Sequence, residues 1–347
     1  MTGTIIELRE VSKRFVKHLD LAERLANRLG AGIREQTVHA VDRVSLSIHE
    51  GEVVGLVGES GCGKSTLGRI IAGLLEVTAG SVLYRGTDRS SLEGERAREA
   101  AIKVQLIFQD PFSALNPRMR IGDIIGEAPA AHGLVPTGTL DDYVDDLMAR
   151  VGLDSGSKRR FPHQFSGGQR QRIGIARALA VNPDFLVCDE AVAALDVSIQ
   201  AQILNLFMDL RDDLGLTCLF ISHDLGVVEH LSDRVAIMYL GRIVESAPTE
   251  SLFAAPNHPY TQALLNEVPR IDVRRRQYEP IRGEIPSPID PPSGCHFHPR
   301  CPHAMTRCAQ ESPELREIEP GRFSACHRND AAPEGKRLGH HPLTMHA

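Results

Sequence analysis

Short apolar runs recur through the first two thirds of the chain, and polar residues follow each of them. Four runs have the length and the β-branched or aromatic content of buried strands, at residues 53–57, 104–108, 185–188 and 218–222. Between them lie segments whose apolar residues recur with helical spacing, at residues 67–75, 140–151 and 170–179. Strands that alternate with helices predict an α/β protein built on a parallel sheet.

Two further segments, residues 4–9 and 38–48, alternate apolar and polar positions as half-buried strands do. The polar residues 17–37 between them predict a helix-leaning insertion. Phe15 precedes this insertion in a short basic turn. Two roles fit its ring equally well, stacking on an adenine base and packing in the core.

A glycine-rich stretch joins the first buried strand to the helical segment after it. Residues 58–65 fit the phosphate-binding pattern G-x-x-x-x-G-K-[ST]. Glycines let successive backbone N–H groups turn toward a polyphosphate, because no Cβ blocks the approach. Lys64 would reach the terminal phosphates, and Ser65 would place its hydroxyl on Mg²⁺. The predicted nucleotide ligands of this loop are Gly58, Ser60, Gly61, Gly63, Lys64, Ser65 and Thr66.

Polar side chains follow the other three buried strands: Gln109, Asp189, Glu190 and His223. The carboxyl ends of parallel strands meet at one edge of a sheet, so we expect these side chains beside the phosphate loop. Asp189 and Gln109 are predicted Mg²⁺ ligands. Glu190 is the predicted general base for the attacking water, and His223 would contact the γ-phosphate. Each residue alone is also typical of an ordinary strand end, so the prediction depends on their convergence.

A second predicted anion cradle opens the helical segment at residues 170–179. It consists of small residues at a helix N-terminus, followed by a glutamine: Ser166, Gly167, Gly168 and Gln169. One chain rarely needs two cradles for one nucleotide. We therefore expect this cradle to face outward and complete the site of another subunit.

Composition narrows the classes of function. The 347 residues predict two domains, or one large domain with an appendage, and a net charge of −6 gives no attraction to nucleic acid. No run approaches the roughly eighteen apolar residues of a membrane span, and no N-terminal signal pattern is present. We expect a cytosolic protein that reaches a membrane only through a partner.

Four of the seven cysteines crowd into the tail, at Cys295, Cys301, Cys308 and Cys326. In a reducing compartment such a group indicates a metal rather than disulfides. A [4Fe–4S] cluster, a tetrahedral Zn²⁺ and unligated thiols all fit, and neighbouring histidines offer substitute ligands, at His296, His298, His303 and His327. Residues 266–294 predict a proline-rich linker that wraps the core, and residues 329–347 a disordered polar end.

The set and order of these motifs over residues 4–265 resemble the nucleotide-binding subunit of an ATP-binding cassette (ABC) transporter. In that family the corresponding parts are the Walker A loop at 58–65, the Q-loop Gln109, the signature at 166–169, the Walker B pair Asp189 and Glu190, the D-loop Asp196 and the switch histidine His223. The signature reads FSGGQ rather than the commoner LSGGQ. The resemblance implies ATP as the nucleotide and a P-loop ABC-type core with a helical subdomain at about residues 112–175.

Further motifs are similar to the F-type ATPase subunit of oligopeptide/dipeptide importers, at residues 107–111, 115–117, 257–261 and 283–295. They imply a nucleotide-binding domain at 1–265 and a C-terminal extension at 266–347, whose cysteines then favour the iron–sulfur cluster over Zn²⁺. The implied partners are a D-type ATPase subunit, two permease subunits and an extracytoplasmic binding protein, at the cytoplasmic face of the inner membrane. The two ATPases would dimerise head-to-tail, and a permease would dock on residues 112–125.

The chain departs from this family at two positions, where Ala191 replaces the usual proline and Ala193 the usual serine. The missing D-loop hydroxyl predicts slower hydrolysis at one site of the ATPase pair. Peptides lead as the cargo, and nickel, glutathione, opines and sugars are the alternatives. A soluble cassette ATPase acting on nucleic acid or ribosomes fits the charge poorly, and a metabolic kinase has no use for the signature.

Overall fold

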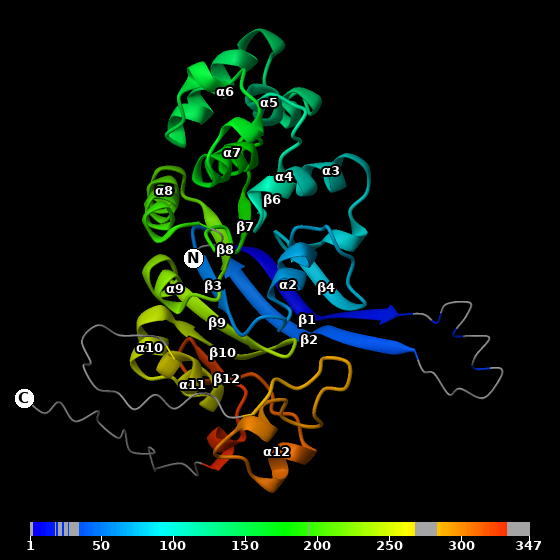
Figure 1. Cartoon of the computed structure of the whole chain (residues 1–347). Coiled ribbons are helices and arrows are strands. Elements are labelled where there is room, and N and C mark those ends of the chain that lie inside the picture. Colours follow the sequence, from blue (N-terminus) through cyan, green and yellow to red (C-terminus); the bar gives the residue numbers. More distant parts are fainter. Residues whose placement is uncertain are drawn as a thin grey trace, which may run out of the picture.

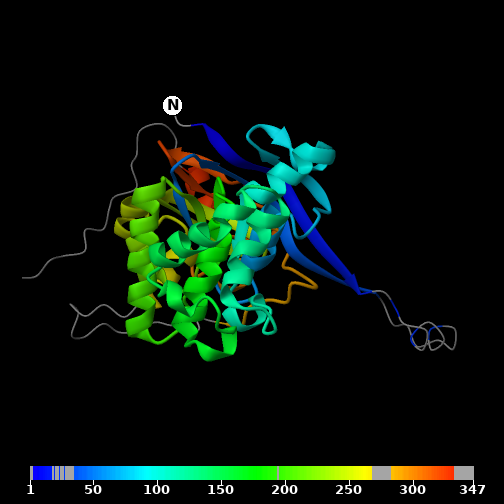
Figure 2. The ribbon, with the colours of Figure 1, turned by 90° about the horizontal axis from the view of Figure 1, so that it is seen from above.

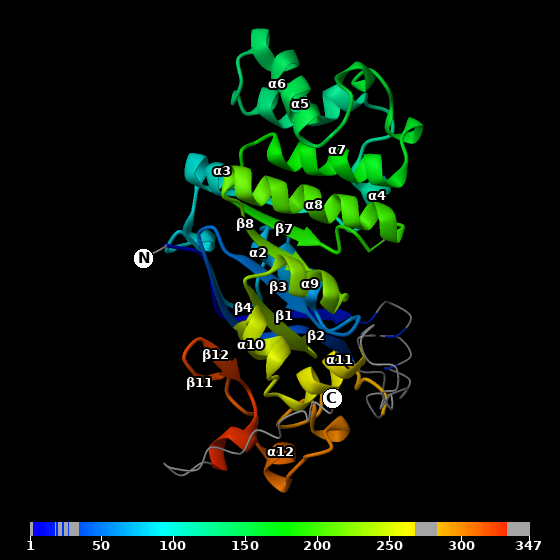
Figure 3. The same cartoon turned by 90° about the vertical axis from the view of Figure 1, so that its left-hand side faces the viewer.

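The structure is a computed structural model, and it describes residues 3–17, 19, 23, 27, 35–193, 195–267 and 283–331. Most of the predicted insertion at 17–37, about half of the predicted linker and nearly all of the predicted polar end lie outside the described residues. Two β-sheets form the centre, and the helices α5 and α6 lie at the opposite end of the molecule from α12 (Figures 1 and 3).

The larger sheet has eight strands in the order β11-β12-β10-β9-β3-β8-β7-β6. The run from β9 to β6 is parallel, and the other three strands join it antiparallel. The strands are β3 (Val53–Val57), β6 (Val104–Ile107), β7 (Phe185–Asp189), β8 (Thr217–Ile221), β9 (Arg234–Tyr239), β10 (Arg242–Pro248), β11 (Arg316–Glu319) and β12 (Arg322–Ser324). The four predicted buried strands are confirmed as β3, β6, β7 and β8.

The smaller sheet is antiparallel, in the order β2-β1-β4-β5. Its strands are β1 (Thr4–Lys17), β2 (Gln36–His49), β4 (Ala79–Tyr84) and β5 (Thr87–Asp88). Strands β1 and β2 run on as a ribbon beyond the packed layers (Figure 2). Phe15 lies near the far end of this ribbon, is 41% exposed, and has the Lys13 amine 5.3 Å from its ring centre. The alternative that Phe15 belongs to the core is therefore wrong.

Helices cover both faces of the larger sheet. Successive strand residues point to opposite sides, and each side packs against different helices. Phe220 of β8 packs into the core cluster that contains Ile173 of α7. Its neighbour Leu219 packs into the cluster that contains Leu67 of α2. Helices α4–α7 come between β6 and β7, as the sequence predicted. The helices are α2 (Lys64–Ile71), α3 (Gly94–Lys103), α4 (Pro111–Ala114), α5 (Ile121–Ala131), α6 (Leu140–Arg150), α7 (Gly167–Leu179), α8 (Val197–Leu214), α9 (Leu225–Leu231), α10 (Thr249–Ala254), α11 (Pro259–Glu267) and α12 (Thr306–Gln310).

The C-terminal extension continues the larger sheet. Strand β12 pairs antiparallel with β10, with Glu245 opposite Ser324 and Ser246 opposite Phe323. Strand β11 then pairs with β12. The backbone ladder therefore crosses the predicted domain boundary at residue 265, which itself stays a prediction.

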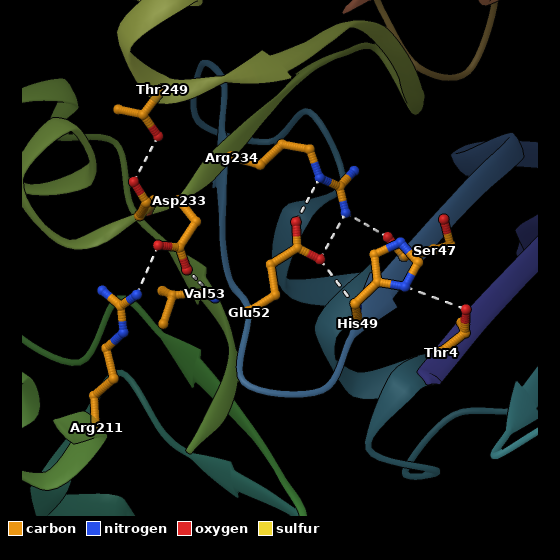
Figure 4. A network of polar contacts seen from close by, with 10 residues as sticks. Thr4, Ser47, His49, Glu52, Val53, Arg211, Asp233, Arg234 and Thr249 are labelled. Atoms are coloured by element: carbon orange, nitrogen blue, oxygen red, sulfur yellow. Dashed lines mark hydrogen bonds and ion pairs between the residues drawn. The ribbon is translucent and has the colours of Figure 1, made fainter. Parts of the chain in front are cut away.

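A polar network holds the amino ends of β3 and β9 (Figure 4). Arg234 donates from Nε to Glu52 Oε1 at 2.7 Å, and the Asp233 carboxylate accepts from the Val53 N–H at 2.8 Å. These bonds involve charged groups that are partly buried, so they are stronger than neutral surface bonds. With the amino end of β3 held here, the loop at its carboxyl end starts from a fixed position.

Candidate functional site

The phosphate loop connects β3 to α2 and turns where only glycine fits. Gly63 has a φ of 108°, and a Cβ on it would lie 2.0 Å from the Ala40 carbonyl oxygen. A Cβ on Gly58 would lie 2.1 Å from the Met238 carbonyl oxygen. Both distances are far below van der Waals contact with a backbone atom that cannot swing away. The loop therefore depends on close packing of backbone against backbone.

Two side chains at the start of α2 face the loop and β7. Lys64 is buried, and its Nζ donates to the carbonyl oxygens of Gly58 at 2.7 Å and Glu59 at 3.0 Å. Ser65 Oγ donates to Asp189 Oδ1 at 2.8 Å. Burial raises the pKa of Asp189, and a bound cation would favour its ionised form. A hydroxyl at the start of the helix after the phosphate loop and a carboxylate at a strand end hold Mg²⁺ in phosphate-loop proteins, so the residues present fit this ion.

Gln109, Glu190 and His223 meet at the carboxyl ends of β6, β7 and β8. Gln109 Nε2 donates to Glu190 Oε2 at 2.6 Å, and His223 Nδ1 lies 3.4 Å from Glu190 Oε1. The Glu190 backbone is left-handed, with a φ of 46°, and its N–H donates to the Ile221 carbonyl at 3.0 Å. This conformation is uncommon for a residue with a side chain. It turns the chain sharply after β7 and leaves the carboxylate between its two neighbours, so the predicted convergence is observed.

The second cradle lies elsewhere. Ser166 caps α7, because its Oγ accepts from the Gln169 N–H at 3.3 Å while Gln169 Oε1 accepts from the Ser166 N–H at 3.0 Å. Both residues are exposed. Since α7 and α2 cover opposite faces of the larger sheet, the structure does not bring this cradle to the phosphate loop of its own chain (Figure 3).

The other predicted ligands lie around these two loops. Ser60 and Gly61 are exposed in the phosphate loop, and Thr66 is half-buried in the first turn of α2. Asp196 is exposed at the start of α8, where its carbonyl accepts from two backbone N–H groups of that helix. Phe15, on the ribbon of β1 and β2, has no contact in the described residues that tests the adenine role.

Comparisons with known proteins agree with this geometry. The family model "ABC transporter" matches residues 41–193, and the model "Oligopeptide/dipeptide transporter, C-terminal region" matches residues 244–308. The chain is 48% identical over 328 residues to the oligopeptide transport ATP-binding protein AppF of Bacillus subtilis (strain 168), covering 93% of this chain and 97% of AppF. The chain belongs to the ABC transporter ATP-binding proteins of this oligopeptide/dipeptide family. YkfD of the same organism is 52% identical over 298 residues, which is 85% of this chain and 91% of YkfD.

The fold comparison leads to the same family of ATPases. The ATP-binding cassette MJ0796, in a dimeric post-hydrolysis structure with ADP and Pi, superposes with a TM-score of 0.60 at 25% identity, over 71% of this chain and 99% of that one. As an ABC transporter ATP-binding protein, the chain is an ATPase whose nucleotide is ATP. In the part of the chain that the structure describes, no helix has both the length and the apolar character needed to cross a membrane.

The four tail cysteines lie in the extension as free thiols. Burial, with contributions from the thiols of Cys308, Cys326 and Cys301, raises the pKa of Cys295 to about 11. Three of the nearby histidines hydrogen-bond to carbonyl oxygens: His296, His298 and His327. Within the described ranges no three His, Cys, Asp or Glu side chains are arranged to hold a metal ion. The described residues therefore give no support to the predicted metal site.

Two contacts to the phosphate loop were not predicted. The Glu59 carboxylate accepts from Arg300 of the extension, and the Glu59 N–H donates to the Tyr260 hydroxyl. Arg300 lies 241 residues from Glu59 in sequence, and no motif spacing links them. The only sequence signal is the position of Arg300, directly before Cys301 in the cysteine-rich segment.

Proposed function

We propose that this chain powers an ABC importer of oligopeptides. Support comes from the match of its tail to oligopeptide/dipeptide transporters and from its 48% identity to a protein named for oligopeptide transport. Its partners would be a D-type ATPase subunit, two permease subunits and an extracytoplasmic binding protein, at the cytoplasmic face of the inner membrane. Nickel, glutathione, opines and sugars are the alternative cargoes.

The proposed hydrolysis uses the side chains that meet at the carboxyl edge of the larger sheet. Lys64 binds the terminal phosphates. Ser65, Asp189 and Gln109 would hold Mg²⁺, which would neutralise phosphate charge. Glu190 accepts a proton from the attacking water, whose oxygen bonds to the γ-phosphorus as the bond from that phosphorus to ADP breaks. His223 contacts the γ-phosphate. The observation that carries this proposal is the position of the Glu190 carboxylate, 2.6 Å from Gln109 and 3.4 Å from His223.

The signature cradle acts, in this proposal, on the nucleotide of a second ATPase subunit. Its support is the exposure of Ser166 and Gln169 and the position of α7 on the face opposite α2. The similar cassette MJ0796 has dimeric structures. Two chains arranged head-to-tail would each supply one phosphate loop and one cradle, so that ATP binding closes the pair and hydrolysis reopens it.

Residues 112–125 are the proposed docking site of a permease. Phe112 is 64% exposed, and the Arg170 guanidinium carbon lies 3.8 Å from its ring centre. An exposed aromatic ring held by a cation is a suitable anchor for a partner, because aromatic and arginine side chains dominate interface energies.

Assembly with the partner subunits in membrane vesicles tests the cargo. ATP turnover should rise when the binding protein and a mixture of oligopeptides are present outside, and it should not respond to nickel, glutathione, opines or sugars. Stimulation by one of these and not by peptides would overturn the peptide assignment and leave the ATPase assignment intact.

The four tail cysteines are proposed to bind a [4Fe–4S] cluster, with Zn²⁺ as the alternative. The proposal rests on the four free thiols of this one stretch and on the effect that three of them have on the pKa of Cys295. Anaerobically purified protein should be brown and contain iron and sulfide, whereas colourless protein with zinc and no iron would exclude the cluster.

A further inference from the structure

One buried ion pair joins the C-terminal extension to the phosphate loop. Arg300 donates from Nη1 to Glu59 Oε2 at 2.7 Å and from Nη2 to Oε1 at 2.9 Å. The Arg300 side chain is 5% exposed and the Glu59 side chain 19%. Two parallel bonds fix the carboxylate in direction as well as position. Glu59 also raises the pKa of Arg300, so the guanidinium stays charged.

A second contact holds the same residue by its backbone. The Glu59 N–H donates to the Tyr260 hydroxyl at 2.9 Å. The Tyr260 ring is buried against Tyr239 at 4.6 Å and Phe297 at 5.4 Å between ring centres. Phe297 itself lies three residues before Arg300 in the extension. The two contacts to Glu59 therefore come from one packed aromatic unit, formed by core and extension together.

Glu59 in turn carries one of the two carbonyl oxygens that accept from Lys64 Nζ. The other belongs to Gly58, the residue before it. A shift of Glu59 would therefore move both acceptors of the Lys64 amine. Because Gly58 and Gly63, two of the three loop glycines, pack against backbone carbonyls, the loop has little room to absorb such a shift.

We propose that Arg300 is a positioning residue for nucleotide binding, through which the C-terminal extension holds the phosphate loop in the conformation that binds MgATP. Arg300 touches neither nucleotide nor metal and acts only through Glu59. The inference depends on the proposed role of residues 58–65 as the nucleotide site. As a consequence, the extension sets the affinity for ATP. Loss of the Arg300–Glu59 pair should lower this affinity more than it lowers the rate of hydrolysis at saturating ATP.

The experiment measures MgATP affinity and steady-state turnover in the full-length chain, with a fluorescent ATP analogue as the binding probe. Arg300→Met and Glu59→Gln should each weaken binding about tenfold, and the double variant should be no weaker than either single variant. The MgATP affinity of Arg300→Lys should lie between those of wild type and Arg300→Met, because an ammonium cannot bind both carboxylate oxygens in parallel. Arg316→Met is the control, since Arg316 belongs to the same extension but pairs with Asp330.

Three results would overturn the inference. They are unchanged MgATP affinity in folded Arg300→Met, additive losses in the double variant, and an equal loss in the Arg316→Met control. If Arg300→Met does not fold, Arg300→Lys and Glu59→Gln carry the same test, with thermal unfolding measured without nucleotide to separate stability from affinity. Lys64→Ala separates this inference from the proposed function: unchanged MgATP binding in that variant would refute the nucleotide site itself.

Discussion

The phosphate loop and the signature cradle are both glycine-containing turns at the start of a helix, but their own chain completes only the first. In the phosphate loop, Lys64 binds loop carbonyls and Ser65 binds the carboxylate at the end of β7. In the cradle, Ser166 and Gln169 hydrogen-bond to each other and are exposed. The difference is what the proposed dimer requires, in which one polypeptide would carry parts of two nucleotide sites.

Among the glycines of the two loops, Gly167 of the cradle differs from Gly58, Gly63 and Gly168. Backbone carbonyls of the same chain leave no room for a side chain at Gly58 and Gly63. A Cβ on Gly168 would lie 2.4 Å from a methyl group of Ile199 on α8. A Cβ on Gly167 would meet only Leu195, at an ordinary 3.5 Å. Nothing in the described part of the chain requires glycine at position 167. In the proposed dimer, the requirement comes from the nucleotide of the partner.

The largest effect on ATP turnover is expected from Glu190→Gln, which removes the proposed general base beside the phosphate loop. Turnover of the assembled ATPase pair should fall about a hundredfold or more, because an amide cannot accept the proton of the attacking water. ATP-bound dimers should persist in size-exclusion chromatography with MgATP. Glu229→Gln, an exposed carboxylate on α9, is the matched control. Normal turnover in Glu190→Gln would rule out its role as base.

Gly167→Leu tests whether the signature cradle serves the nucleotide of the partner subunit. We expect turnover of the pair to fall at least about tenfold, because a side chain would block the approach of the partner's phosphates to the helix N-terminus. MgATP affinity of the single chain should stay within about twofold of wild type, since α7 lies on the opposite face from α2. A loss of affinity in the single chain would mean that both loops serve one nucleotide, and the comparison would fail.

Acid pH should lower the stability of the residues that support the phosphate loop. His258 Nδ1 accepts a hydrogen bond from the N–H of Tyr260 at 3.1 Å, and the Tyr260 hydroxyl in turn binds Glu59 of the loop. Burial lowers the pKa of His258 to about 3. The unfolded chain, with a histidine pKa of about 6.5, binds the extra proton first, so stability is complete above about pH 6.5 and is lost as pH falls toward 3. At pH 5 this histidine alone should remove about 2 kcal/mol from the free energy of unfolding.

Urea unfolding at pH 7 and pH 5 measures this loss. His258→Asn keeps an acceptor for the Tyr260 N–H but does not titrate, so it should flatten the pH dependence. His230→Asn, at an exposed position on α9, should leave it unchanged. An equal pH dependence in His258→Asn and wild type would contradict the assignment to His258.

The smallest effect is expected from Ala193→Ser, at an exposed position between β7 and α8. If the missing hydroxyl slows one site of the pair, restoring it should raise turnover by about two- to threefold, the size of a single modest hydrogen bond. Single-turnover measurement on the assembled pair would detect this change. An unchanged rate would count against the idea that position 193 links the two loops.

The sequence predicted the carboxyl edge of the sheet well. Strands β3, β6, β7 and β8 are short apolar runs ended by polar residues. That local pattern was enough to predict that Gln109, Glu190 and His223 lie close together. The pairing of β9 with β10 and of β10 with β12 was not predicted, because sheet partners are set by tertiary packing rather than by local periodicity. Arg300 and Glu59 were missed for a related reason, since a bond across 241 residues leaves no spacing to read.

Phe15 illustrates the limit for a single side chain. An aromatic ring in a short basic turn suited a core position as well as a ligand contact, and only its exposure on the ribbon of β1 and β2 decided against the core. The metal site predicted at the four tail cysteines stays a prediction, because cysteine spacing alone does not fix the mutual geometry of the thiols.

The way the extension finishes the larger sheet has a consequence for solubility. An open strand edge invites a strand from another molecule, and short, charged outer strands discourage it. Strand β11 is four residues long and contains Arg316, Glu317 and Glu319. A shortened chain without the extension would instead offer the bare backbone of β10 to its neighbours. The tail thereby protects the protein from intermolecular strand pairing, independently of whether any nucleotide is bound.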